Sequence, residues 1–219
     1  MITYKDIKNN DKVKTYIQKA NEALEVLGYT EHSFAHVTKV AESAKYILST
    51  LGYSHHEIEL AQIAGYIHDI GNIVNREDHA HSGALIAFRL LDNLDMPPED
   101  IGTIVSAIGN HDEGTGIPVS PVSAALILSD KSDVRRSRVT NRDLTRFDIH
   151  DRVNYSVTKS TLEINEDHTE IKLSLDVDTQ YSSVMDYFEI FMKRMIMCRK
   201  AAEFLNLRFK LIINGQSLI

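Results

Sequence analysis

The sequence predicts a mainly α-helical protein that carries a small α+β appendage of strand–strand–helix–strand order at its C-terminal end. Two observations lead to this prediction. Up to about residue 150, apolar residues recur at spacings of three and four, the period of helices that bury one face. Beyond it, residues 169–177 alternate apolar and polar side chains, as a half-buried strand does. We therefore divide the chain into a helical domain, 1–150, and an appendage, 151–219, that could serve dimerisation or regulation.

The helices of the first part follow from apolar periodicity and from the signals that start and stop helices. We expect them at about 13–27, 37–51, 54–67, 78–91, 97–108 and 122–128. Ser54 and Glu57 have the spacing of a capping box. Asp78 is the expected N-cap of its helix, and Pro97-Pro98 opens the next one. The glycine- and proline-containing stretch 114–118 is expected to be a loop.

The appendage is predicted from a second set of patterns. The strand at 169–177 is expected to pair with a strand at 153–164 across the turn 165–168. The apolar parity of the earlier segment shifts between Val157 and Leu162, which indicates a β-bulge. A helix through 184–198 and a strand at 208–213 complete the unit.

The composition favours a soluble cytoplasmic protein. The 219 residues are 43% hydrophobic and 25% charged, which is typical of a globular domain. Because 31 acidic residues outnumber 24 basic ones, a nucleic-acid-binding surface is not expected as the main role. The single cysteine, Cys198, cannot form an internal disulfide, which fits a reducing compartment. The sequence has neither a long apolar run nor an apolar signal-peptide core, so no membrane partner is expected.

The apolar stripes of the expected helices carry titratable side chains, which is unusual for a protein interior. The inward-facing groups of this kind are His36, His68, His81, His111 and Asp130, and Asp69 lies beside His68. Burying an unpaired carboxylate costs several kcal/mol, as much as the net stability of a small domain. A bound divalent metal is the simplest compensation. Imidazole and carboxylate ligands without thiolates favour Mn, Fe, Co or Ni over Zn or Mg. His79 lies off the stripe of its helix and is expected to be exposed.

Four of these residues resemble a known signature. His36, the doublet His68-Asp69 and Asp130 match the H…HD…D pattern of the HD-domain metal-dependent phosphohydrolases, within the local sequences AGYIHDIGN and LILSDKSD. The resemblance covers about residues 30–140 and leaves the appendage outside. It implies an all-helical core with one divalent metal held by these four side chains.

The same resemblance extends to a second metal. Some family members carry two further histidines between the doublet and the last aspartate, and His81 and His111 lie where that pattern places them. It therefore implies one or two divalent metals per chain. If two bind, Asp69 bridges them. The sequence departs from the pattern at Asn72, where Lys or Arg commonly follows HDIG, and at Asp112, where a second histidine is common.

The resemblance implies a phosphohydrolase that cleaves a phosphate ester of a nucleotide or other small molecule by metal-activated hydroxide. Asp69 would orient the attacking water and take its proton. Three basic residues are candidate phosphate contacts. Lys131 directly follows Asp130, Arg135 lies one helical turn beyond Lys131, and Arg76 precedes the helix that carries His81. Asp112 and Glu113 are candidate outer partners of His111. We expect the pocket walls at 72–80 and 112–120.

Two other functions fit the same residues. Some relatives with a di-iron site oxidise small substrates with oxygen, and others have become regulatory binding modules. The GYP signature of the cyclic-dinucleotide subgroup is absent from the sequence. The expected partner is a small phosphorylated substrate, and the appendage strands could extend a sheet across a homodimer.

Overall fold

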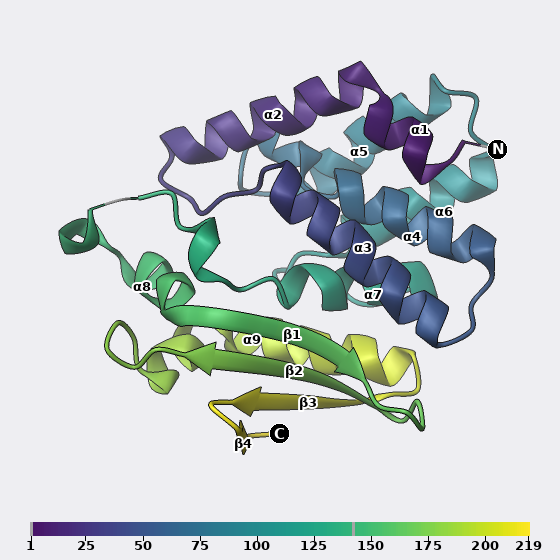
Figure 1. Cartoon of the computed structure of the whole chain (residues 1–219). Coiled ribbons are helices and arrows are strands. Elements are labelled where there is room, and N and C mark those ends of the chain that lie inside the picture. The colour runs from purple at the N-terminus through teal and green to yellow at the C-terminus, as the bar shows by residue number, and fades with distance from the viewer. Residues whose placement is uncertain (1, 142) are drawn as a thin grey trace.

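The computed structural model describes residues 2–141 and 143–219, and it confirms the predicted fold class. Figure 1 shows a layered body of helices with a small sheet on one side of it. The helices of the body are α1 (Tyr4–Asn9), α2 (Asp11–Val26), α3 (Phe34–Thr50), α4 (His55–Ile67), α5 (His79–Asp92), α6 (Pro98–Gly109) and α7 (Pro121–Lys131). Short 3-10 turns lie at η1 (Ile70–Ile73), η2 (Arg136–Arg138) and η3 (Leu144–Arg146).

The helix start signals in the sequence agree with the structure in most places. Ser54 and Glu57 form the expected capping box of α4, and Pro98 opens α6. Asp78 does precede α5, but its backbone is left-handed and its side chain accepts no capping hydrogen bond from the described residues. The first helix, α1, was not predicted because its polar sequence has too few apolar positions to show a period.

Residues 143–219 contain one more α-helix and one more strand than the sequence predicts. Its elements are α8 (Ile149–Ser156), β1 (Val157–Ile164), β2 (Glu170–Val177), α9 (Val184–Phe204), β3 (Arg208–Ile213) and β4 (Gln216–Ser217). The expected strand at 153–164 is therefore wrong over its first residues. Asp148 accepts a hydrogen bond from the Asp151 amide and so starts α8, which continues up to the strand.

The sheet has the order β1-β2-β3-β4 and mixed strand directions. β1 and β2 pair antiparallel, β2 and β3 pair parallel through the crossover helix α9, and β3 and β4 pair antiparallel. The predicted bulge is confirmed by a shift of register between Val157 and Lys159. The parallel pair needs a long connection, which is why α9 lies behind the strands in Figure 1.

A continuous apolar core joins the helical body to the C-terminal part. Leu126 of α7, Leu173 of β2 and Phe191 of α9 are all buried in the same cluster. Helix α9 packs on α7 with one side and on the sheet with the other. The end of α7 and the middle of α9 are thereby held close together. The division at residue 150 stays a prediction.

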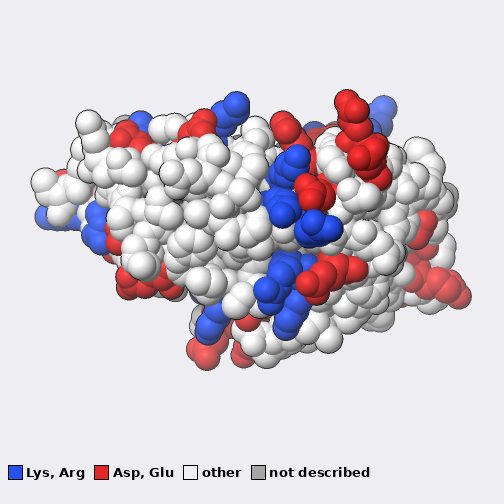
Figure 2. All heavy atoms as spheres, turned by 90° about the horizontal axis from the view of Figure 1, so that it is seen from below, with Lys and Arg blue, Asp and Glu red and all other residues white. Residues whose placement is uncertain are grey.

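The surface carries charges of both signs. In Figure 2, basic and acidic side chains lie together in a band across the middle of the face seen from below, with uncharged surface on either side. Every helix within 2–141 and 143–219 is too short or too polar to cross a bilayer.

Gly71 allows the 3-10 turn η1 to lie directly against α5. A Cβ atom at this position would be 1.9 Å from the carbonyl oxygen of His79 and 2.4 Å from the amide nitrogen of Gly83. Since both neighbours are backbone atoms, no side-chain rotation could relieve the clash. This close approach places the segment after Asp69 against the first turn of α5.

We predict that Gly71→Ala will lower the free energy of unfolding by about 1–3 kcal/mol or more, because the backbone must move to admit the methyl group. Gly102→Ala is the matched control, since the described residues leave open space around Gly102 within α6. That control should be stabilised by roughly 0.5–1 kcal/mol. Urea unfolding of both variants tests the prediction, and a Gly71→Ala protein as stable as the wild type would contradict it.

Candidate metal centre

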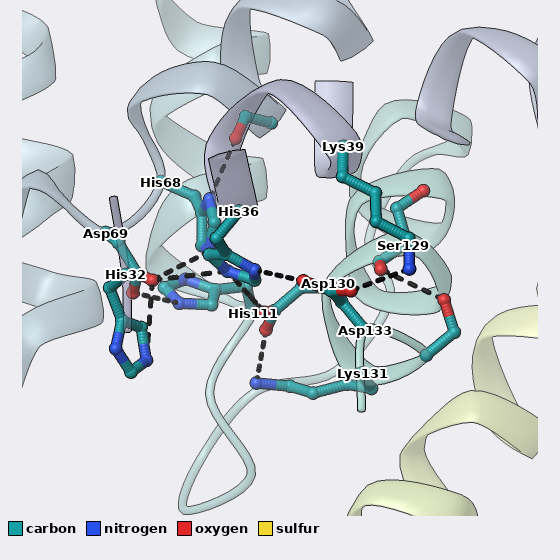
Figure 3. A network of polar contacts seen from close by, with 12 residues as sticks. His32, His36, Lys39, His68, Asp69, His111, Ser129, Asp130, Lys131 and Asp133 are labelled. Carbon is teal, nitrogen blue, oxygen red and sulfur yellow. Dashed lines mark hydrogen bonds and ion pairs between the residues drawn. The ribbon is translucent and has the colours of Figure 1, made fainter. Parts of the chain in front are cut away.

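Buried imidazoles and carboxylates from separate helices converge on one point inside the helical body (Figure 3). His36 comes from α3, the pair His68 and Asp69 follows α4, His111 follows α6, and Asp130 lies in the last turn of α7. Two sets of three donor atoms lie within 4.8 Å of one another: those of His36, His68 and Asp130, and those of His68, Asp69 and His111. The structure therefore brings these five predicted residues together.

The sixth predicted residue, His81, is not part of this group. Its side chain is 56% exposed, and its Nδ1 atom lies 3.7 Å from Asp78 on the surface. The expected stripe was wrong because Leu85 and Phe88, which defined it, are themselves exposed. Helix α5 turns a different face inward, formed by the small residues Ala80, Gly83, Ala84 and Ala87.

His79 takes the place expected for His81, although the sequence predicted it to be exposed. Its ring is buried, with Nε2 at 3.2 Å from Nε2 of His111 and 3.5 Å from Oδ1 of Asp69. The stripe of alanine and glycine was the signal that could have found it. Small side chains let α5 approach closely, and a residue one turn before Gly83 then faces the interior.

The histidines are oriented by hydrogen bonds at Nδ1. The acceptors are Asp133 Oδ2 for His36 and main-chain carbonyl oxygens for the others: Gly65 for His68, Arg76 for His79 and Ile108 for His111. Because carbonyl and carboxylate oxygens accept hydrogen bonds, each Nδ1 carries a proton and Nε2 is the atom that faces the centre. The Nε2 atoms of His36 and His68 are buried and have no hydrogen-bond partner among the described residues. Such unpartnered nitrogens beside carboxylates fit a divalent metal ion.

The carboxylate of Asp69 lies between two sets of imidazoles. Its Oδ2 atom is 3.2 Å from Nε2 of His68 and 3.6 Å from Nε2 of His36, while its Oδ1 atom faces His79 and His111 at 3.5 and 3.8 Å. Burial alone would raise the pKa of Asp69, but the neighbouring imidazoles outweigh it and hold the pKa well below the usual range. The two oxygens could thus serve two ions.

Asn72 accounts for one departure from the family pattern. Its amide nitrogen donates to the main-chain carbonyl of Asp69 at 2.8 Å and to the Oδ1 atom at 3.1 Å. The side chain is buried, so this hydrogen bond fixes the direction of the carboxylate.

His32 is a neighbour of the centre that the sequence analysis missed. Its Nε2 atom lies 3.9 Å from Oδ2 of Asp69, and its Nδ1 atom hydrogen-bonds to the carbonyl oxygen of Thr30. The residue precedes α3 and belongs to no apolar stripe. Periodicity therefore carries no signal for it.

Lys131 is directed at carboxylates rather than at open space. Its Nζ atom lies 2.7 Å from Oδ2 of Asp130 and 3.3 Å from Glu113, which also forms a 2.7 Å ion pair with Arg194 of α9. Burial lowers the pKa of Lys131, but the two carboxylates outweigh this and raise it. Lys131 thus fixes Asp130 so that its Oδ1 atom faces His36 and His68 at 3.3 and 3.5 Å. The predicted contact of Lys131 with phosphate stays a prediction.

Asp133 is a second residue that the sequence analysis did not single out. It is fully buried and contacts Nδ1 of His36, Nζ of Lys39 and Nε of Arg135 at 2.8, 2.8 and 2.9 Å. Its place three residues after Asp130, in LSDKSD, was the available signal. Arg135 was expected one helical turn beyond Lys131, but α7 ends at Lys131 and Arg135 pairs with Asp133 instead.

The electrostatics of the centre favour a cation. Burial lowers the pKa of His68, yet the carboxylates of Asp69 and Asp130 outweigh it and raise the pKa to about 10. A proton and a divalent ion compete for the same nitrogen. The arrangement therefore has the charge and the donor types of a metal site.

Comparison with known proteins agrees with this geometry. The family model described as HD domain matches residues 33–189, more than half of the chain. The chain belongs to the HD domain family. The match extends beyond the 30–140 segment in which the sequence signature lies and includes β1, β2 and the start of α9.

Two individual proteins are similar to this chain. An uncharacterized protein of Methanocaldococcus jannaschii, MJ1020, is 25% identical over 158 residues. That alignment covers 62% of this chain and 60% of the relative, so the chain spans less than two thirds of the relative's length. The crystal structure of a predicted HD superfamily hydrolase from an uncultured Thermotogales bacterium aligns with a TM-score of 0.44 and 23% identity, over 58% of this chain and 71% of that one.

We predict that Asp133→Ala will lower the free energy of unfolding by about 3–5 kcal/mol, because it leaves buried or half-buried cations without their carboxylate. Asp176→Ala, an exposed aspartate on β2, is the control and should change stability by less than about 0.5 kcal/mol. Equal urea midpoints for the two variants would show that Asp133 does not hold this network together.

Proposed function

We propose that this protein is a metal-dependent phosphohydrolase that cleaves a phosphate ester of a small molecule. The observation that supports it best is the pair of buried, unpartnered Nε2 atoms of His36 and His68 beside the carboxylates of Asp69 and Asp130. Ordinary packing leaves few such atoms, because an unsatisfied buried donor or acceptor costs about 1–3 kcal/mol. Membership of the HD domain family supports the same proposal.

The donor atoms form two sets that share Asp69. One set comprises His36, His68, Asp130 and the Oδ2 atom of Asp69. The other comprises His79, His111 and the Oδ1 atom of Asp69. We propose that the first set holds one divalent ion and the second set another, with His79 in the role that the sequence assigned to His81. The donors are imidazole and carboxylate alone, which favours Mn, Fe, Co or Ni.

The residues of the chain divide the work of catalysis between them. Divalent ions at such a site lower the pKa of water and supply positive charge for the phosphoryl oxygens. Asp69 orients the attacking water, and Asn72 keeps its carboxylate in place. Lys131 holds Asp130, and through it the geometry of the donors. The nonbridging oxygens gain charge along the reaction, so cationic groups beside the centre stabilise the transition state.

We predict that Asp69→Ala will abolish metal retention and lower phosphate release by more than about 100-fold, since even partners outside the ligand set are worth about 10–100-fold. Asp167→Ala, in the exposed turn between β1 and β2, is the control. The assays are elemental mass spectrometry and phosphate release from phosphomonoesters, phosphodiesters and nucleotides. Full activity in Asp69→Ala would reject the assignment. Turnover that requires oxygen would favour the di-iron oxygenase instead.

We predict that His79→Ala will reduce the number of metal ions retained per chain, whereas His81→Ala will leave it unchanged. The two residues lie two positions apart in the first turn of α5, but only His79 is buried beside Asp69 and His111. Metal content per chain after identical purification separates the two variants. Loss of metal from His81→Ala but not from His79→Ala would contradict this assignment and favour His81, the residue predicted from the apolar stripe.

A further inference from the structure

A cavity of about 370 Å³ lies beside the metal centre, where the helical body meets α8 and α9. His32 is part of its wall, and the same ring faces Asp69 at 3.9 Å, so the cavity adjoins the centre. Small-molecule sites typically have volumes of about 300–1,000 Å³, which places this one at the small end. Its size fits one compact molecule next to the metal ligands.

Three guanidinium groups line this cavity. Arg76 precedes α5, Arg138 ends η2, and Arg194 comes from the middle of α9. Like charges that share one cavity repel each other, and a bound anion relieves the repulsion. Only Arg76 was expected at the site, from the wall predicted at 72–80. The other predicted wall, 112–120, contributes none of the described residues that line the cavity.

Two of these arginines are held in position from behind. Arg138 is buried and donates from Nε to the carbonyl oxygen of Glu31 at 2.9 Å and from Nη1 to that of Asp133 at 2.8 Å. Arg194 forms its ion pair with Glu113 through Nε, which leaves its two terminal nitrogens without a hydrogen bond to the described residues. The planar fork of a fixed guanidinium matches the geometry of a phosphoryl group.

The C-terminal part supplies a different kind of wall. Asp148, Asp151 and Asn154 of the α8 segment line the cavity together with the aromatic ring of Phe191. Carboxylates and amides accept hydrogen bonds from hydroxyl groups, and the carboxylates repel a second anion. The cavity is therefore cationic on one side and hydrogen-bond accepting on the other.

We propose that this cavity is the substrate site, that Arg194 with Arg138 and Arg76 binds the phosphoryl group, and that the substrate is a phosphate monoester whose leaving group carries hydroxyl groups and no second anion. The inference rests on the proposed phosphohydrolase function and gives it a substrate class. It also assigns the C-terminal part a role, because α8 and α9 complete the site rather than regulate it from outside.

The anion half of the proposal is tested by calorimetric titration of the metal-containing protein with inorganic phosphate, which is not consumed. Arg194→Gln should weaken phosphate binding about tenfold or more, since it removes charge-assisted hydrogen bonds. Arg199→Gln is the matched control, because Arg199 lies on the same helix, is exposed and pairs with Glu203. Its phosphate affinity should equal that of the wild type.

Unchanged phosphate affinity in a folded Arg194→Gln protein would overturn the proposal. If that variant fails to fold, Arg76→Gln serves instead, because Arg76 lies in a connecting segment outside the core and should show the same loss. The protein could bind phosphate through Arg194 and yet hydrolyse no phosphate ester. That result would support the anion site and contradict the proposed phosphohydrolase function. Hydrolysis of phosphate esters by a protein whose phosphate affinity does not depend on these arginines would support the phosphohydrolase function and contradict the anion site.

The leaving-group half is tested with two phosphonates, whose P–C bond is not hydrolysed. 3-Hydroxypropylphosphonate ends in a hydroxyl group and 3-phosphonopropionate ends in a carboxylate. The wild type should bind the hydroxyl compound several-fold more tightly, and Asp151→Asn should reduce that difference by removing a negative charge from the wall. Equal affinities of the wild type for the two compounds would overturn this half.

Discussion

The structure depends on the burial of carboxylates among imidazoles at the centre of a helical body. Asp69, Asp130 and Asp133 are all buried, and no apolar core accommodates such charges without compensation. Here the compensation is built in layers. Imidazole rings surround the two inner carboxylates, while Lys131, Lys39 and Arg138 neutralise the carboxylates from outside. The body is organised so that the ends of α3, α4, α5, α6 and α7 deliver the members of this network.

The outer layer controls the inner one. The Nδ1 hydrogen bonds orient the imidazoles, Asn72 directs Asp69, and Lys131 occupies one oxygen of Asp130. These contacts leave the remaining donor atoms pointing at a common centre. Preorganisation of this kind reduces the cost of assembling a site when an ion binds. It also explains why cationic side chains that the sequence offers as phosphate contacts, Lys131 and Arg135, are instead committed to carboxylates.

The C-terminal part is tied to the same network rather than added to it. Helix α9 packs on α7, and its Arg194 pairs with Glu113, which also contacts Lys131. Three successive ion pairs thus link Arg194 in the middle of α9 to Asp130. The family match, which continues into α9, is consistent with the C-terminal part belonging to the functional unit.

The sequence by itself determined the helical class, most helix and strand bounds, the β-bulge, and the convergence of His36, His68, Asp69, His111 and Asp130. Periodicity and start signals are local properties, so they can be recognised without knowing what packs against what. The tertiary structure decided which face of α5 is inward, and hence that His79 and not His81 lies at the centre, because the small residues and the large apolar residues of that helix indicate different faces. It also placed His32, Asp133 and Arg194, since these residues lie on no apolar stripe and meet the site only through packing of distant segments. Hydrophobic patterns in a sequence indicate which face of an element is buried, but they do not indicate what it packs against. The partners of a charged group depend on the whole fold.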